Sequence, residues 1–156
     1  MRGLEPLRPH VHREQWQACR SASRGCARQV ELKGKTVTRQ HFGTSHVPLS
    51  PAVRAGDFVY VSGQVPVVDG KIISGGIGEQ TKQVLENIST ALKLAGCELS
   101  DVVKTTAWLK HAEDFAGFNA AYAPFFPTNP PARSTAESRL MIDILVEIEA
   151  IAYKPL

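Results

Sequence analysis

Ile144-Leu-Val-Glu-Ile-Glu-Ala-Ile-Ala-Tyr153 is the clearest strand in this 156-residue chain. Its side chains alternate between two faces, since successive residues of a strand point in opposite directions: Val146, Ile148, Ala150 and Ala152 on one face, and Leu145, Glu147, Glu149 and Ile151 on the other. Both faces carry apolar residues. We therefore expect one face to pack on the core of this chain and the other to be buried against a second copy.

The elements before this strand alternate between strand and helix patterns. Residues 57–62 read as a strand between Gly56 and Gly63, and residues 65–73 as a hairpin with Asp69-Gly70 at its turn and Pro66 at an edge or bulge. Helical spacing runs from Ile77 to Ala95, where Gly96 is a natural stop.

The remaining segments complete the order β-β-α-β-α-β-β. They are a strand at 101–110, a helix at about 113–125 that is closed by prolines, and a strand at 132–138. This order predicts an α+β two-layer sandwich, a mixed sheet with two helices on one face.

The net charge of +3 is unevenly distributed. Residues 1–40 hold 9 Lys/Arg against 3 Asp/Glu, a net of +6, whereas residues 41–156 hold 9 against 12, a net of −3. We therefore predict a disordered basic extension at 1–40 and a mildly acidic domain at 41–156. An acidic domain is poorly suited to phosphate backbones, so a nucleic-acid partner is not expected.

Three explanations of residues 1–40 stay open. Arginine and serine favour a presequence, although Glu5, Glu14 and Glu31 count against it. A basic arm for nucleic acid or an anionic surface is the second. The third, which we favour, is a solvated extension without function.

The sequence contains no pattern typical of a metal site, a membrane-spanning segment or a disulfide framework. The three cysteines, Cys19, Cys26 and Cys97, form no CxxC pair, and Cys97 is expected to be a half-buried free thiol. No apolar run is long enough to span a membrane. We expect neither metal nor cofactor, and the cytoplasm is the default compartment.

Two segments remain as candidates for chemistry. Pro130-Pro-Ala-Arg-Ser-Thr135 places one arginine among small residues, and the last strand carries Glu147 and Glu149. Arginine can clamp a carboxylate with two parallel hydrogen bonds, and a glutamate can hold or activate a water. From spacing alone, a structural ion pair between Arg133 and one of these glutamates is the more common arrangement.

The domain resembles the RidA/YjgF/endoribonuclease L-PSP family over nearly all of residues 44–156. Six segments in family order carry the resemblance: Phe58-Val-Tyr-Val-Ser-Gly-Gln-Val-Pro66, Gln83-Val-Leu-Glu-Asn-Ile88, Asp101-Val-Val-Lys-Thr-Thr106, Phe118-Asn-Ala-Ala-Tyr122 with Phe125-Phe126, Pro131-Ala-Arg-Ser134 and Glu147-Ile-Glu-Ala-Ile-Ala152. The resemblance implies a chorismate-mutase-like fold, assembled as a homotrimer with active sites between subunits.

The resemblance also implies a reaction, the hydrolysis of reactive enamines and imines such as 2-iminobutanoate or 2-iminopropanoate to 2-oxo acids and ammonia. These substrates are released by pyridoxal-phosphate enzymes. Arg133 falls on the family's carboxylate-binding arginine and Glu147 on the glutamate that positions water. Ser62, Gly63 and Asn119 fall on pocket residues, and Thr135 is expected to contact the substrate with them.

This chain departs from the family at three places. A Gly-Pro-Tyr segment found in many deaminating members is replaced by Pro48-Leu-Ser-Pro51, and a cysteine often found two positions after the arginine is Thr135. The connection from Arg133 to Glu147 is about one residue shorter. These departures leave the substrate side-chain preference and the subgroup open. Because a fold does not fix a function, a non-catalytic, ligand-binding or chaperone-like trimer and an RNA-cleaving relative stay open as alternatives.

Overall fold

The computed structural model describes residues 31–32, 35–36 and 39–156, and Glu31–Leu156 form one compact unit. Most of the basic segment 1–40, for which we predicted disorder, lies outside the described residues. Within the described part, no helix is both long enough and apolar enough to cross a membrane.

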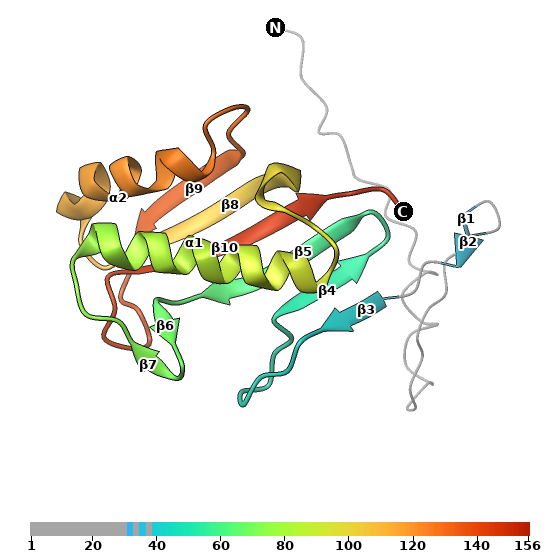
Figure 1. The fold of residues 1–156 in the computed structure, drawn as a ribbon, viewed down its shortest axis with the longest axis horizontal. Coiled ribbons are helices and arrows are strands. Elements are labelled where there is room, and N and C mark those ends of the chain that lie inside the picture. The colour runs from blue at the N-terminus through green and yellow to red at the C-terminus, as the bar shows by residue number, and fades with distance from the viewer. Residues whose placement is uncertain (1–30, 33–34, 37–38) are drawn as a thin grey trace, which may run out of the picture. The chain divides into compact units, whose positions relative to one another are not determined.

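A six-stranded mixed sheet forms the centre of the domain (Figure 1). Its spatial order is β3 (Arg39–Phe42), β4 (Ala52–Ala55), β5 (Phe58–Gln64), β10 (Val146–Tyr153), β8 (Val102–Leu109) and β9 (Ala132–Glu137). All neighbours are antiparallel except β8 and β9, which run parallel. The strand predicted from residues 144–153 is thus central, paired on both sides, whereas β9 is an edge.

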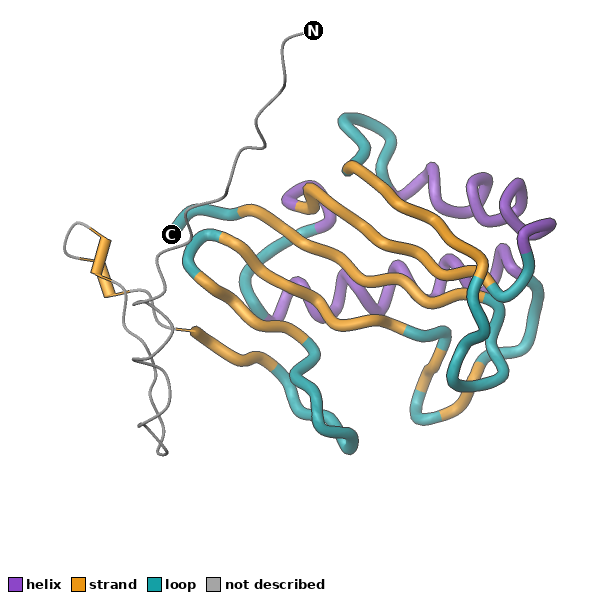
Figure 2. The backbone as a smooth tube through the Cα atoms, turned by 180° about the vertical axis from the view of Figure 1, so that it is seen from behind, coloured by secondary structure: helices purple, strands orange, loops and turns teal. Residues whose placement is uncertain are grey.

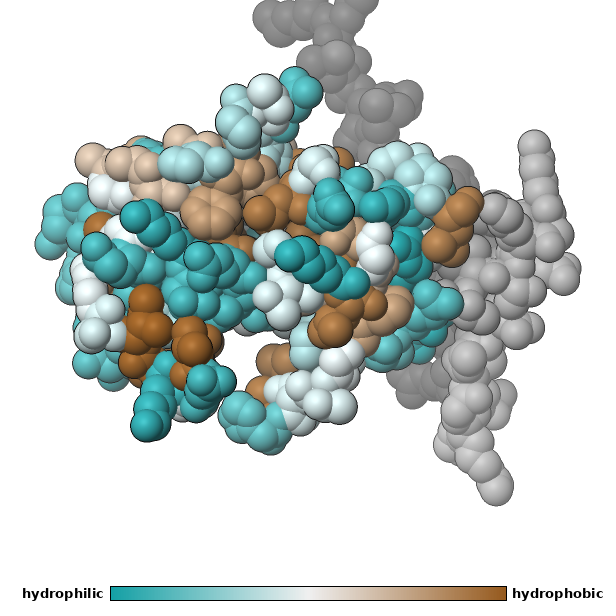
Figure 3. Space-filling model, in the orientation of Figure 1, coloured by the Kyte–Doolittle hydropathy of each residue, from teal (hydrophilic) through white to brown (hydrophobic). Residues whose placement is uncertain are grey.

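Two short ribbons accompany the sheet: β1 (Glu31–Leu32) pairs with β2 (Lys35–Thr36), and β6 (Val67–Val68) pairs with β7 (Lys71–Ile72). The second ribbon confirms the expected hairpin. Asp69 and Gly70 have φ of 50° and 76°, the left-handed values that a two-residue turn requires. Val68 and Ile72 are exposed there and contribute to an apolar patch (Figure 3).

Two α-helices, α1 (Ile77–Leu94) and α2 (Phe115–Tyr122), cover one face of the sheet. Gly96, with φ of 71°, follows the end of α1 as expected. The second helix is shorter than predicted. Its flanks, Ala112–Asp114 and Ala123–Phe125, are 3₁₀ turns, as is Leu99–Asp101 before β8. Pro124 gives the reason at the C-terminal end, because proline has no N–H to continue an α-helical ladder.

The hydrophobic core lies between the helices and the sheet. Val146, Ile148, Ala150 and Ala152 of β10 are each at most 1% exposed, so the predicted alternation places this set inward. The opposite face of the sheet is uncovered in the single chain (Figure 2), and Phe58, Tyr60 and Tyr153 are exposed on it. The predicted fold class, an α+β sandwich with both helices on one face, is confirmed.

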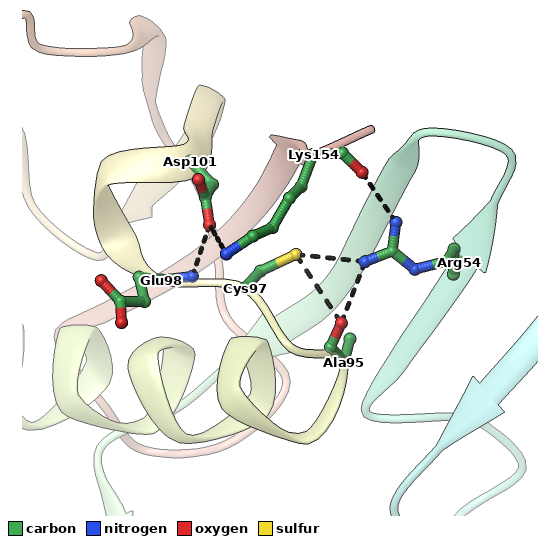
Figure 4. Close-up of polar contacts among 6 residues, drawn as sticks. All are labelled: Arg54, Ala95, Cys97, Glu98, Asp101 and Lys154. Carbon is green, nitrogen blue, oxygen red and sulfur yellow. Dashed lines mark hydrogen bonds and ion pairs between the residues drawn. The ribbon is translucent and has the colours of Figure 1, made fainter. Parts of the chain in front are cut away.

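A buried arginine joins the end of α1 to the last strand (Figure 4). Arg54 is 4% exposed; it donates to the carbonyl of Ala95 at 2.9 Å, to the carbonyl of Lys154 at 3.0 Å and to Sγ of Cys97 at 3.5 Å. Cys97 is only 1% exposed, so our expectation of a half-buried thiol was wrong. It is buried because the core closes over it beside Arg54.

Candidate active site

Arg133 lies on the edge strand β9, on the side of the sheet that the helices cover. Pro130 and Pro131 precede the strand and bias the chain toward an extended path. In the parallel register Arg133 is opposite Thr105, whose side chain is buried in the core. Thr135 lies two residues farther along β9 and therefore shares this side of the sheet.

Aromatic side chains of α2 surround the guanidinium of Arg133. Its Cζ lies 4.7 Å from the ring centre of Tyr122, 5.0 Å from that of Phe118 and 5.8 Å from that of Phe115. These distances fall within the range of cation–π attraction, about 6 Å. Nη2 also donates a hydrogen bond of 2.6 Å to Oδ1 of Asn119.

No carboxylate neutralises Arg133 among the residues that the structure describes, where the ion pairs are Lys110–Asp143 and Lys154–Asp101. The structural ion pair that spacing alone suggested is therefore wrong. A hollow of about 440 Å³ lies beside the guanidinium, lined by Asn119, Tyr122, Ala123, Phe126, Pro130, Pro131 and Arg133. A partly buried cation next to an open hollow is suited to bind a small anion.

Glu147 lies on the opposite side of the sheet. It alternates with the buried Val146 and Ile148 and is cross-strand partner to Trp108 of β8. A second hollow of about 170 Å³ contains it, lined by Trp108, Ser138, Arg139, Leu140, Met141 and Glu147. Burial, and then the negative charge of Glu149, raise the pKa of Glu147 above its ordinary value. A carboxylate of this kind accepts a proton more readily than an exposed one.

Gly63 is placed against Glu147 by an irregularity of β5. Gln64 pairs with Ile148 and Val61 with Ala150, so two residues of β5, Ser62 and Gly63, stand opposite one of β10. A bulge of this kind re-aims the backbone. A Cβ at position 63 would overlap Oε1 of Glu147, which is why glycine fits here. Ser62 donates its hydroxyl to the carbonyl of Ser50 at 2.8 Å.

The residues singled out in the sequence thus form two groups in one chain. Arg133 and Asn119 meet on the helix side, with Thr135 on the same side, and Glu147 meets Gly63 on the uncovered side, next to Ser62. Within the described residues, no group of three or more His, Cys, Asp or Glu side chains could hold a metal. A single copy does not bring the guanidinium and the Glu147 carboxylate into one pocket.

Sequence reasoning did not predict that aromatic rings of α2 pack against the guanidinium of Arg133. Phe118 and Tyr122 were assigned only to the buried face of a helix, and Thr105 only to a strand. The available signal was Asn119, because it precedes Tyr122 by three residues on α2 and a half-buried amide beside an aromatic ring favours a polar partner.

Comparison with known proteins agrees with the geometry. The family model described as endoribonuclease L-PSP matches residues 40–154. A RutC family protein of Pyrococcus horikoshii is 50% identical over 110 residues, which cover 69% of this chain and 87% of the relative. The human 2-iminobutanoate/2-iminopropanoate deaminase is 40% identical over 110 residues, 69% of this chain and 80% of the relative.

A solved structure has the same fold. The YjgF gene product of E. coli superimposes with a TM-score of 0.69 at 35% identity, over 73% of this chain and 98% of that one. The family match, the sequence relatives and the shared architecture lead to one assignment: this chain is a member of the RidA/YjgF/endoribonuclease L-PSP family.

Proposed function

We propose that this chain hydrolyses 2-imino acids, such as 2-iminobutanoate and 2-iminopropanoate, to 2-oxo acids and ammonia. One observation carries the proposal: Arg133 has no carboxylate partner among the described residues and lies beside a hollow, held by aromatic rings and Asn119. The activity for which the human relative is named supports the same reaction.

In the proposed mechanism Arg133 binds the substrate carboxylate and thereby fixes the C=N bond. Water adds to the carbon of the protonated imine, the iminium, and passes a proton to Glu147, so that a neutral carbinolamine forms. Glu147 returns that proton to the amine nitrogen. The C–N bond then breaks as the carbinol hydroxyl gives its proton to the ionised Glu147 and becomes the carbonyl; ammonia leaves, and Glu147 passes the proton to solvent. An iminium carbon is already electrophilic, so the steps need only positioning and proton transfer.

The complete site would require two copies, with Arg133 of one and Glu147 of its neighbour. The opposite placement of the two residues supports this arrangement, as does the uncovered apolar face of the sheet with Phe58, Tyr60 and Tyr153. We propose a homotrimer with a site at each subunit boundary. Its substrates would come from pyridoxal-phosphate enzymes that release enamines.

A coupled assay tests the reaction. Threonine dehydratase generates the imine from threonine, semicarbazide traps it, and the release of 2-oxobutanoate competes with trapping. The chain should accelerate this release, and Arg133→Ala should not, while eluting from gel filtration like the native protein. Arg39→Ala, at an exposed arginine, is the matched control. Binding of 2-oxobutanoate without any acceleration would instead favour the non-catalytic alternative.

A further inference from the structure

Tyr122 connects the buried core to the guanidinium of Arg133. Its hydroxyl and that of Thr105 lie 2.8 Å apart, and the two residues are 5% and 1% exposed. Thr105 is itself the register partner of Arg133 on the adjacent strand. The ring of Tyr122 therefore contacts two neighbouring strands: its hydroxyl meets Thr105 of β8, and its face meets the guanidinium of Arg133 of β9.

The ring of Tyr122 has little freedom to turn. The ring centre of Phe118 lies 5.4 Å from it and that of Phe126 lies 4.8 Å from it, and the hydroxyl is held by Thr105. Aromatic pairs at these separations attract one another. A buried hydroxyl is also costly to leave without a partner, which further favours this one orientation.

Tyr122 is also the closest of the three rings to the guanidinium, at 4.7 Å. A ring face attracts the flat side of a guanidinium, which leaves the N–H groups at its edge directed outward. Nη2 uses one of these donors on Asn119. The remaining donors are those that a planar carboxylate would meet.

We propose that Tyr122 is a positioning residue, which, locked by Thr105, holds the plane of Arg133 so that the guanidinium edge presents two donors to a substrate carboxylate in the hollow. The inference rests on the proposed function for the identity of that carboxylate. A tyrosine phenol is neutral near pH 7, and burial raises the pKa of Tyr122 further from that pH. A neutral phenol does not compete with the substrate for the positive charge of Arg133.

The test compares 2-oxobutanoate binding, measured by calorimetry and by NMR titration, with steady-state kinetics of imine hydrolysis. Tyr122→Leu removes the ring face and should raise both Kd and KM by at least about tenfold, with kcat changed less than about threefold. Tyr122→Phe keeps the ring and should recover part of this loss, with Kd about threefold above the native value.

A double-mutant cycle separates positioning from a purely structural role. Lysine is a point charge without a planar fork, so Tyr122→Leu should weaken binding by less than about threefold in an Arg133→Lys background. Equal factors in both backgrounds would overturn the inference, and so would a Tyr122→Leu protein that binds like the native one.

If Tyr122→Leu does not fold, Thr105→Val and Tyr122→Phe decide instead. Each substitution removes the hydrogen bond between Thr105 and Tyr122 and should raise Kd by about threefold. The double variant should raise Kd no further, because both substitutions remove the same hydrogen bond. An unchanged Kd in both single variants would overturn the inference. Because binding of 2-oxobutanoate needs no turnover, a chain that binds through Tyr122 and Arg133 but never hydrolyses imines would contradict only the proposed reaction.

Discussion

Gly63 lies directly against the carboxylate of Glu147, and the space that a Cβ would need at position 63 is already filled by Oε1 of Glu147. The contact joins the bulge of β5 to the central strand β10. It lies on the uncovered face of the sheet, away from Arg133, so it offers a way to disturb the proposed water-holding group without touching the proposed carboxylate anchor.

Gly63→Ala should lower kcat/KM for imine hydrolysis by about a hundredfold, because the displaced carboxylate no longer holds water at the reacting carbon. Calorimetry should still find 2-oxobutanoate affinity within about threefold of the native protein. Gly78→Ala is the matched control, since a Cβ there meets no atom within 4 Å. Full activity of Gly63→Ala would remove Glu147 from the mechanism.

Subunit mixing should restore activity to two inactive variants. Arg133→Ala and Glu147→Gln each lack one half of the proposed site, and averaged over all randomly assembled trimers about a quarter of the sites combine an intact arginine with an intact glutamate. The refolded equimolar mixture should therefore reach about a quarter of native activity per site. A mixture as inactive as its parents would show that the two residues do not act across a boundary.

The acid limb of the pH profile should reflect Glu147. Its pKa is raised, first by burial and then by Glu149, and the ionised form is the one that accepts a proton from water. Activity should therefore fall as pH drops through a value above that of an ordinary glutamate. Glu149→Gln removes the neighbouring negative charge, so ionisation becomes easier and the limb should move to lower pH.

Exposed Glu113 supplies the control for this profile, because Glu113→Gln changes a charge in the 3₁₀ turn before α2 and not beside Glu147. The pH dependence of kcat/KM for the three proteins, measured at constant ionic strength, is the comparison. A limb that moves equally in both variants would mean that the shift comes from net charge rather than from Glu149.

Glu147→Gln should be inactive yet more stable than the native protein at pH 7. The pKa of Glu147 is raised in the folded state, so its carboxyl costs no stability at pH below the pKa of the unfolded chain. As the pH rises through the folded-state pKa, ionisation lowers the free energy of unfolding. Glutamine removes this penalty, so the two melting temperatures should converge at acidic pH and separate at neutral pH. A native protein that is the more stable of the two at pH 7 would contradict the raised pKa.

Local sequence patterns predicted most of the sheet and both helices, because strong alternation and clear stop signals act over a few residues. The strands β3 and β4 were missed. Ala52–Ala55 carries a buried Arg54 where an apolar residue would be expected, and distant partners, chiefly the carbonyls of Ala95 and Lys154, satisfy that arginine. Contacts across 41 and 100 residues leave no local signal.

The candidate site was also predictable only in part: short motifs identified its residues, but not how packing places them. Arg133 and Glu147 were identified through the family resemblance, since single residues in short motifs are recognisable in a linear sequence. Their placement on opposite faces of the sheet depends on the register of β9 and β10. The hydrogen bond between Thr105 and Tyr122 beside Arg133 depends on how α2 packs against the sheet. Packing of this kind joins segments that no sequence window contains.

Arg54→Met should lower the free energy of unfolding by about 3 kcal/mol, because it removes charged hydrogen bonds that satisfy two carbonyls at the end of α1 and β10. Urea unfolding at a fixed protein concentration measures the change, since association also contributes to stability. Arg39→Met, at an exposed arginine, should change the free energy by less than about 0.5 kcal/mol. Equal effects of the two substitutions would show that the hydrogen bonds of Arg54 to Ala95 and Lys154 add nothing to the free energy of unfolding. The apolar face of α1 would then hold this helix to the sheet alone.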